Sequence, residues 1–290
     1  MSIRIADCGE VSLAYETFGS PEDPALVLVM GLATQMLGWH DDFCQLLADS
    51  GLYVIRFDNR DIGLSTHLAA AGMPDLSPVF VGGSIKDAPY ALADMADDTC
   101  RLLDALGIHR AHVVGASMGG MIAQEFALRH PDRLLSLTSI MSTPAPSIGA
   151  PTPAAMGALF SAPPTTPEEA GARSVEVYRV IGSPGYPLDE AGLSERGQES
   201  FRRANDPAGV ARQFAAIQAG GDRTERLGAL DVRTLVLHGE DDPLVQLEGG
   251  TATAEAVPAA RLVTYPGMGH DLPRALWPAI IGEIVSHARG

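Results

Sequence analysis

The sequence predicts an α/β protein with a mostly parallel central sheet, flanking helices and a mainly helical cap, and three observations lead to this prediction. Short, continuous apolar runs recur along the chain, and such runs are typical of strands that are buried on both faces of a sheet. Segments with helical spacing of apolar residues lie between these runs, which indicates the crossovers that join parallel strands. From about residue 144 to residue 228 the strand signals are missing, and this segment is the predicted cap.

The predicted sheet begins with a hairpin and continues with apolar runs. Apolar and polar residues alternate in 2–5 and again in 11–15, and Gly9 lies near the turn between them. The run 25–30 is continuous and ends at Gly31. The remaining predicted strands are residues 53–57, 111–114, 234–237 and 261–265.

Helical periodicity separates these strands. In 91–106 the apolar residues fall on one helical face, and the acidic residues fall largely on the other. The helix predicted over 118–130 stops before Pro131, and a helix over 276–287 closes the chain. Because ligands of parallel sheets bind beyond the carboxyl ends of the strands, we expect the functional residues in the loops that follow the strands.

The predicted cap interrupts the alternation of strands and helices. A proline-rich stretch begins at Pro144, and helix-like segments follow around 168–181, 194–204 and 210–219. A helical insertion between two strands of a sheet is typical of a cap or lid over a binding site. We therefore expect a core of residues 1–143 and 229–290 and a cap of residues 144–228.

The balance of charges argues against polyanionic partners. The chain of 290 residues carries 36 acidic and 20 basic side chains, which gives a formal net charge of −16. Such a surface repels nucleic acid and anionic membranes, so we expect neither nucleic-acid binding nor a stable association with membranes. The hydrophobic content of 46% and the charged content of 19% are those of a globular protein rather than a disordered one.

The cysteines and the N-terminus favour a cytoplasmic protein. Cys8, Cys44 and Cys100 are widely spaced and odd in number, which fits reduced thiols rather than a disulfide framework. The first eight residues lack the apolar core of a signal peptide, and no apolar run approaches the ~20 residues that cross a bilayer. His109 and His112 have no carboxylate or cysteine set around them, so no metal site is predicted.

A candidate nucleophile lies in the segment Gly115-Ala116-Ser117-Met118-Gly119, which matches the pattern Gly-x-Ser-x-Gly. The pattern alone is moderately specific, but here it follows a predicted strand and precedes a predicted helix, which is the setting of a nucleophile elbow. In such a turn the serine occupies a strained conformation, small flanking residues let neighbouring backbone pass, and the helix directs its amide dipoles at the site. The alternative is a glycine-rich helix entry with a capping serine.

His270 is the candidate base, because a serine hydroxyl needs a partner that accepts its proton. In this type of site the acid and then the histidine follow the serine along the chain. Of the other histidines after Ser117, His130 ends the helix that leaves the nucleophile, His238 lies inside an apolar strand, and His287 lies in the terminal helix. His270 instead follows a strand in a glycine-rich loop, where the alternative is a histidine of an ordinary turn.

Three carboxylates follow the strand 234–237, in the segment Gly239-Glu240-Asp241-Asp242-Pro243. One of them is expected to orient His270 through the second ring nitrogen. Asp242 is the first choice, Asp241 is the second, and Glu240 is the last.

Backbone N–H groups near Ser117 are the expected oxyanion hole. The charge that develops on a substrate oxygen needs preorganised donors, each worth roughly 3–4 kcal/mol of barrier. We expect the N–H of Met118, directly after the nucleophile, and the N–H of Leu32, in the loop after the strand 25–30. Gly31 would then be small so that the substrate carbonyl can approach, and the alternative is a plain glycine turn at the strand end.

The substrate pocket is expected to be apolar, because apolar residues are frequent in these loops and in the cap. Most of these side chains belong to the core in any fold of this kind, and methionines among them would give a wall that adapts to several acyl shapes. Besides Gly31, the candidates are Met36, Trp39, Met156, Phe160, Tyr178, Tyr186, Phe214 and Met268.

Several segments together resemble the α/β-hydrolase family over the whole chain. Residues 58–65, Asp-Asn-Arg-Asp-Ile-Gly-Leu-Ser, are similar to the family signature Asp-x-Arg-Gly-x-Gly-x-Ser, with Asp61 in place of a glycine. Met30-Gly31 takes the place of the His-Gly of many members, and anthracycline (aclacinomycin) methylesterases carry a Met-Gly-type loop at this point. Three other segments carry the likeness to the family: 115–119, 238–243 and 267–270. In the cap, the segments 181–187 and 207–214 look like those of LipG-type esterases of actinobacteria.

This resemblance implies an α/β-hydrolase fold and ester hydrolysis without a metal or an organic cofactor. The sequence therefore predicts a serine carboxylic ester hydrolase that forms an acyl-enzyme with a small to medium, apolar, small-molecule ester. It predicts a monomer or a homodimer. C–C bond hydrolases, thioesterases and perhydrolases that use the same three residues are the alternatives, and a non-catalytic ligand receptor is the alternative outside enzymes.

Overall fold

A single mixed sheet forms the centre of the protein. The strands are β1 (Arg4–Asp7), β2 (Ser12–Phe18), β3 (Ala25–Val29), β4 (Tyr53–Phe57), β5 (Ala111–Ala116), β6 (Leu134–Ile140), β7 (Thr234–Gly239) and β8 (Arg261–Tyr265). The computed structural model describes residues 2–80, 83, 85 and 87–290, and within these residues the strands pair in the order β1-β2-β4-β3-β5-β6-β7-β8. β2 runs antiparallel to both of its neighbours, and the pairings from β4 to β8 are parallel. The predicted fold class, with its opening hairpin, is confirmed.

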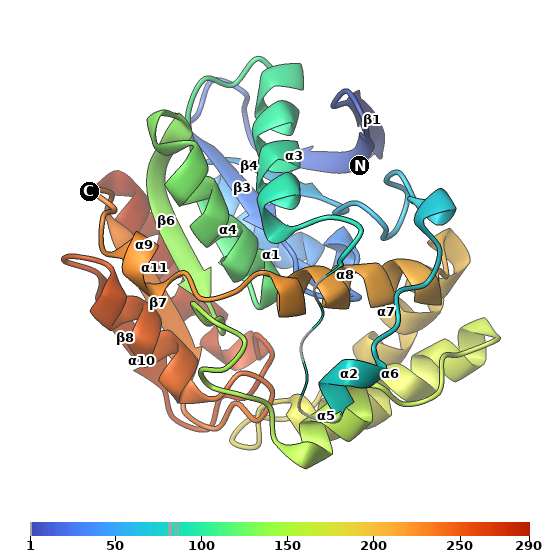
Figure 1. Ribbon diagram of the computed structural model, residues 1–290. Helices are drawn as coiled ribbons and strands as arrows, with labels where there is room; N and C mark the ends of the chain where they lie inside the picture. Colours follow the sequence, from blue (N-terminus) through green and yellow to red (C-terminus); the bar gives the residue numbers. More distant parts are fainter. Residues whose placement is uncertain (1, 81–82, 84, 86) are drawn as a thin grey trace.

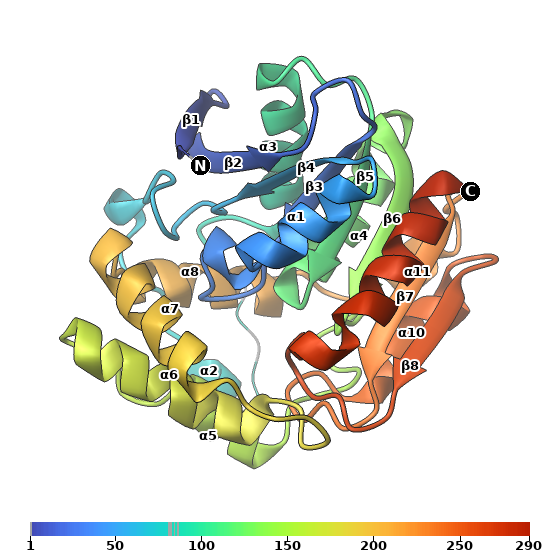
Figure 2. The same ribbon diagram turned by 180° about the vertical axis from the view of Figure 1, so that it is seen from behind.

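Helices cover both faces of this sheet. The α-helices are α1 (Asp41–Asp49), α2 (Ser77–Phe80), α3 (Leu92–Ala105), α4 (Met118–Arg129), α5 (Pro153–Leu159), α6 (Pro167–Ile181), α7 (Glu190–Arg203), α8 (Pro207–Ala219), α9 (Thr224–Leu227), α10 (Leu247–Ala256) and α11 (Trp277–Arg289). Short 3-10 helices are η1 (Met36–Gly38), η2 (Ala69–Ala71), η3 (Pro131–Arg133) and η4 (Arg274–Leu276). α3 and α4 pack side by side on one face (Figure 1), and α1 and α11 pack together on the opposite face (Figure 2). Among the described residues, no helix combines the length and apolar character that a bilayer span requires.

The middle strands are buried on both faces, as their apolar runs predict. Every residue of β3 is buried. Val27 belongs to the hydrophobic cluster under α3 and α4, whereas Leu26 and Leu28 belong to the cluster under α1 and α11. Because side chains alternate along a strand, one short run thus supplies both cores.

The sequence analysis missed β6 and the helices α1, α2, α5, α9 and α10. β6 carries Ser136, Thr138 and Ser139, which are buried, so the strand lacks the continuous apolar run that identifies its neighbours. The buried hydroxyl of Ser136 has a partner, because its Oγ lies 2.8 Å from His112 Nδ1 on β5. Elsewhere the predicted and observed boundaries differ by a few residues.

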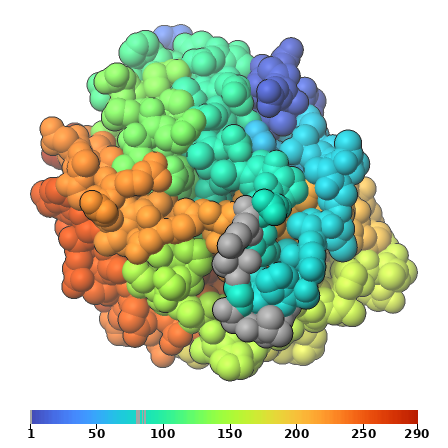
Figure 3. All heavy atoms as spheres, in the orientation of Figure 1, coloured from blue at the N-terminus to red at the C-terminus, as the bar shows by residue number. Residues whose placement is uncertain are grey.

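The chain between β6 and β7 forms the helices α5 to α9, and most of this insertion lies beyond the carboxyl end of β6 (Figure 1). In the space-filling view the yellow-green part of the insertion lies beside the cyan residues that follow β4 (Figure 3). Arg223 joins the two ends of the insertion, because its N–H donates to Pro144 O and its Nη2 donates to Thr143 O, both at 3.0 Å. The side chain of Arg223 is fully buried, so its hydrogen bond to Thr143 is shielded from water.

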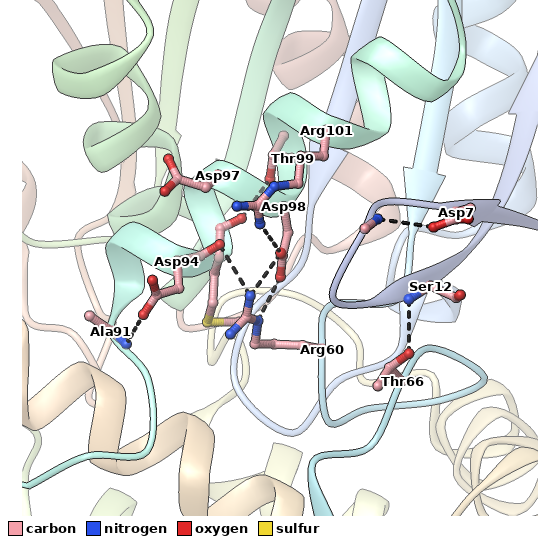
Figure 4. Close-up of polar contacts among 12 residues, drawn as sticks. Asp7, Ser12, Arg60, Thr66, Ala91, Asp94, Asp97, Asp98, Thr99 and Arg101 are labelled. Atoms are coloured by element: carbon pink, nitrogen blue, oxygen red, sulfur yellow. Dashed lines mark hydrogen bonds and ion pairs between the residues drawn. The ribbon is translucent and has the colours of Figure 1, made fainter.

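The loop after β4 is fixed to α3 on the core side. Arg60 donates to both carboxylate oxygens of Asp98, at 2.6 and 2.8 Å, and both side chains are buried (Figure 4). Asp94 accepts the N–H of Ala91 at 2.7 Å and so caps the start of the same helix. This anchored loop brings Asp58 and Asp61 to the insertion, where they contact helices α7 and α8.

Candidate active site

Ser117 occupies the sharp turn between β5 and α4. Its backbone has φ 57° and ψ −123°, a strained conformation for a residue with a side chain. A Cβ atom on Gly115 would lie 2.0 Å from Gly119 O, and one on Gly119 would lie 2.1 Å from Val29 O. The two glycines of the Gly-x-Ser-x-Gly pattern are therefore required by close backbone approach, which explains their spacing around the serine.

His270 lies between Ser117 and Asp242. Its Nε2 is 2.9 Å from the Ser117 Oγ, and its Nδ1 is 2.7 Å from Asp242 Oδ2. With the ring proton on Nδ1, the imidazole donates to the carboxylate, and Nε2 accepts from the serine hydroxyl. The side chains of His270 and Asp242 are buried, so water screens these interactions little.

The orientation of the Asp242 carboxylate is fixed by the backbone that follows it. Its Oδ1 accepts the N–H groups of Leu244 and Val245, both at 2.9 Å, which leaves Oδ2 for His270. The neighbouring carboxylates have other partners, since Asp241 accepts the N–H of Gly267 and Glu240 accepts the hydroxyl of Thr264. Of the three carboxylates in this loop, the structure brings Asp242 to the imidazole.

The other three histidines after Ser117 have hydrogen-bond partners away from the serine. His238 is fully buried on β7, and its Nε2 donates to Val245 O at 2.8 Å. Burial lowers the pKa of His238, which keeps the ring neutral. His130 Nε2 lies 2.7 Å from Asp97, and His287 Nε2 lies 3.1 Å from Leu137 O.

The loop after β3 passes directly beside the nucleophile. A Cβ atom on Gly31 would lie 3.0 Å from the Ser117 Cβ and 3.5 Å from its Oγ. Leu32, whose N–H is one candidate oxyanion donor, follows in this loop, and Met118, the other, is the first residue of α4. A helix N-terminus leaves its first N–H groups without intrahelical partners, so a developing negative charge is favoured there.

Buried polar side chains hold this loop from two sides, and the sequence analysis missed them. Gln213 on α8 accepts the N–H of Ala33 at 3.2 Å and donates to Arg60 O at 2.8 Å. Asp58 accepts the N–H of Met36 at 2.7 Å. The loop therefore contacts both the segment after β4 and the insertion between β6 and β7. The segment 207–214, which carries part of the resemblance, was the sequence signal of the contact with Gln213.

The candidate pocket residues lie in different surroundings. Met36, Trp39 and Met268 are fully buried, and Trp39 and Met268 pack in the cluster under α1 and α11. Phe160 and Phe214 meet edge to face, with ring centroids 4.8 Å apart. Met156 and Tyr178 lie on α5 and α6, and Tyr186 donates its hydroxyl to Pro266 O at 3.2 Å. Which of these side chains contact a substrate stays a prediction.

One group among the described residues has the composition of a metal site. Asp61, His67 and Asp206 offer ligand atoms that all lie within 4.8 Å of one another. Arg212 lies 2.8 Å from Asp61 and 3.2 Å from Asp206, so a side chain of the protein already pairs with both carboxylates. Burial lowers the pKa of His67, but its hydrogen bonds to Gly63 O and to Asp206 outweigh burial, and the pKa is raised. These contacts describe an ion-pair cluster between the loop after β4 and α8.

The chain is similar to known hydrolases in sequence and in structure. A family model described as alpha/beta hydrolase fold matches residues 24–273. Rhodomycin D methylesterase DauP of Streptomyces sp. is 30% identical over 100% of this chain and 99% of its own, and the bifunctional esterase/perhydrolase DCH of Acinetobacter calcoaceticus is 26% identical over 96% of each. The crystal structure of a hydrolase from Pseudomonas aeruginosa matches with a TM-score of 0.72 at 25% identity, covering 99% of this chain and 98% of that one.

Proposed function

Because the chain belongs to the α/β hydrolase fold family and is a hydrolase of the esterase type, we propose that it cleaves carboxylic esters through an acyl-enzyme formed on Ser117. The observation that carries this proposal is the continuous line of hydrogen bonds from the Ser117 Oγ through His270 to Asp242. Such a line is what converts an ordinary alcohol into a nucleophile.

In the first half of the reaction, Ser117 Oγ attacks the acyl carbonyl while His270 Nε2 takes its proton. The imidazolium that forms is stabilised by Asp242, which lies 2.7 Å from Nδ1. When the tetrahedral intermediate collapses, His270 gives the proton to the leaving alcohol, and the acyl group stays on Ser117. The N–H groups of Leu32 and Met118 would stabilise the oxyanion, each by roughly 3–4 kcal/mol of barrier.

In the second half, water takes the place of the alcohol. His270 accepts a proton from this water, the hydroxide adds to the acyl carbon, and the serine oxygen leaves with the same proton. The carboxylic acid is released and the enzyme returns to its starting state. All proton transfers pass through one nitrogen, Nε2, whose place beside the Ser117 Oγ is fixed by the hydrogen bond at Nδ1.

The substrate that we propose is a small to medium, apolar ester. The methylesterase relative acts on rhodomycin D by its name, which supports a methyl ester as the first compound to test. The aromatic contact between Phe160 and Phe214 and the half-buried Tyr178 and Met156 supply apolar surface on the insertion. We expect this surface to bind the acyl side of the ester.

A second reaction has one specific observation in its favour. The esterase/perhydrolase relative combines two activities by its name, and a perhydrolase differs only in that hydrogen peroxide replaces water in the second half-reaction. C–C bond hydrolysis and thioester hydrolysis with the same residues are the further alternatives, and a non-catalytic receptor is the alternative outside enzymes. The compounds that the protein turns over distinguish these enzyme classes, and a receptor would turn over none of them.

A panel of esters with graded acyl and alcohol parts, measured on the wild type and on Ser117→Ala, tests the proposal. We expect turnover of several esters by the wild type and none above background by Ser117→Ala, with thioesters and peroxide as competing substrates in parallel. Undiminished turnover by Ser117→Ala would rule out the proposed nucleophile. The division into a core of 1–143 and 229–290 and a cap of 144–228, the cytoplasmic location and the monomeric or homodimeric state stay predictions.

A further inference from the structure

The cap segment between α6 and α7 lies against the loop that carries His270. The N–H of His270 donates to Ile181 O at 2.7 Å, and the N–H of Gly185 donates to Gly267 O at 2.9 Å. The two backbones are in direct contact, because a Cβ atom on Gly269 would lie 2.3 Å from Gly182 O. The loop of the candidate base is therefore supported by a segment that is distant from it in the sequence.

Ser183 binds this loop on both sides of His270. Its Oγ accepts the N–H of Gly269 at 2.9 Å. The same hydroxyl donates its proton to the Asp271 carboxylate in a short hydrogen bond. A hydroxyl can donate once and accept at the same time, so one side chain fixes the residue before the imidazole and the residue after it.

We propose that Ser183 is a positioning residue that holds His270 within reach of Ser117. The loop needs such support, because Gly267 has a φ of +75° and the glycines around His270 allow many conformations. A base must remain within about 0.5 Å of the productive geometry, and fixed supporting contacts achieve this. This inference rests on the proposed function, since it gives His270 the role of the base.

The charge of Asp271 gives a second reason for the contact. Burial raises the pKa of Asp271, the hydrogen bond from Ser183 opposes this effect, and the nearby Asp242 adds to it. Without the hydroxyl, the buried Asp271 carboxylate loses its side-chain donor, so the residue that follows His270 is held less firmly.

The test compares four proteins by their rate of reaction with a fluorophosphonate probe and by their turnover of p-nitrophenyl butyrate. These are the wild type, Ser183→Ala, Ser183→Thr and Thr165→Ala. Thr165 is the matched control, because it is an exposed cap residue whose hydroxyl bonds to Glu169 of the cap. We expect Ser183→Ala to lose about tenfold or more in labelling rate and kcat, with KM within about twofold, because a displaced base slows chemistry rather than binding.

Ser183→Thr keeps the hydroxyl, so it is expected to react within about threefold of the wild type, and Thr165→Ala is expected to match the wild type. Ser183→Ala with the wild-type labelling rate, a loss confined to KM, or a Ser183→Thr variant as slow as Ser183→Ala would each overturn the inference. Should Ser183→Ala not fold, as judged by thermal unfolding, Ser183→Cys replaces it, and a wild-type rate for that variant overturns the inference while a reduced rate supports it.

The same experiment separates this inference from the proposed function. Labelling of the wild type but not of Ser117→Ala, together with full labelling of Ser183→Ala, would leave the serine mechanism intact and remove the role of Ser183. A wild type that the probe does not label would overturn both.

Discussion

The carboxylate of Asp61 forms a two-point ion pair with Arg212. Asp61 Oδ2 accepts from Nε and Oδ1 accepts from Nη2, both at 2.8 Å, and both side chains are buried. Asp61 has a φ of +67°, a conformation that favours glycine, and it replaces the glycine of the family signature. The backbone strain at Asp61 is therefore accompanied by an ion pair that joins the loop after β4 to α8.

Replacing Asp61 with the glycine of the signature is expected to destabilise the protein. The change relieves the positive φ but leaves Arg212 buried without its main partner, so the free energy of unfolding should fall by about 3 kcal/mol in urea titrations. The double variant Asp61→Gly/Arg212→Leu should recover part of this loss, since it removes the buried charge that has lost its two-point partner. An Asp61→Gly protein as stable as the wild type would show that the ion pair contributes no more to stability than the strained backbone at Asp61 costs.

Asp242→Asn tests the assignment of the acid. An amide cannot hold the imidazole in the tautomer that leaves Nε2 free, so kcat should fall by about ten-thousand-fold with little change in KM. Glu240→Gln is the matched control in the same loop, because Glu240 bonds to Thr264 at 2.7 Å rather than to His270. A similar loss in both variants would point to the charge of the loop rather than to Asp242.

Gln213→Leu tests whether the loop after β3, which carries the proposed oxyanion donor Leu32, depends on its contact with α8. The change leaves the N–H of Ala33 and the carbonyl of Arg60 without their side-chain partner, so kcat and the rate of fluorophosphonate labelling should fall by about tenfold to a hundredfold. Gln198→Leu is the control, because the amide of Gln198 bonds to Ser194 and Arg202 of its own helix. Labelling of Gln213→Leu at the wild-type rate would contradict the role of this contact.

The lowered pKa of the buried His112 should make the free energy of unfolding depend on pH. Burial, followed by the positive charge of Arg233, lowers the pKa of His112 from 6.5 to about 4. The unfolded chain then binds this proton before the folded one does, so the stabilisation is complete above pH 6.5 and is lost as pH falls toward 4. The loss should reach about 3 kcal/mol across that window.

Urea titrations at pH 7, 5.5 and 4 measure this loss. In the double variant His112→Val/Ser136→Ala, which removes both members of the buried hydrogen bond, the fall in stability over the same pH range should be smaller. An identical pH dependence in the wild type and in this variant would assign the effect to other groups.

Local sequence patterns predicted those strands, turns and helices whose residues themselves carry an apolar run, a glycine pattern or a helical period. The strand, turn and helix around Ser117 follow from an apolar run, closely packed glycines and a helical period, and each of these signals lies within a few residues. β6 was not predicted because Ser136, Thr138 and Ser139 are polar but buried. Their burial is a consequence of the neighbouring strands and cannot be recognised from the segment itself. Burial of polar side chains depends on partners far away in the chain, such as His112 for Ser136.

The candidate site, too, was predicted only as far as local sequence patterns reach. The order of serine, acid and histidine restricts the choice to a few residues, but Asp241 and Asp242 differ by one position. Backbone contacts distinguish them: the N–H groups of Leu244 and Val245 orient Asp242, and the N–H of Gly267 binds Asp241. Gln213 and Ser183 were missed because polar residues of the insertion between β6 and β7 resemble ordinary surface residues in the sequence. Their contacts span 180 and 86 residues, and no local pattern records such distances.

The most direct test of the proposed mechanism is the mass of the protein after a rapid quench with an ester substrate in excess. We expect a species heavier by one acyl group, with the added mass on the peptide that carries Ser117, and no such species from Ser117→Ala or from His270→Ala. An acyl group on any other residue, or product formed at the wild-type rate by Ser117→Ala, would contradict the account.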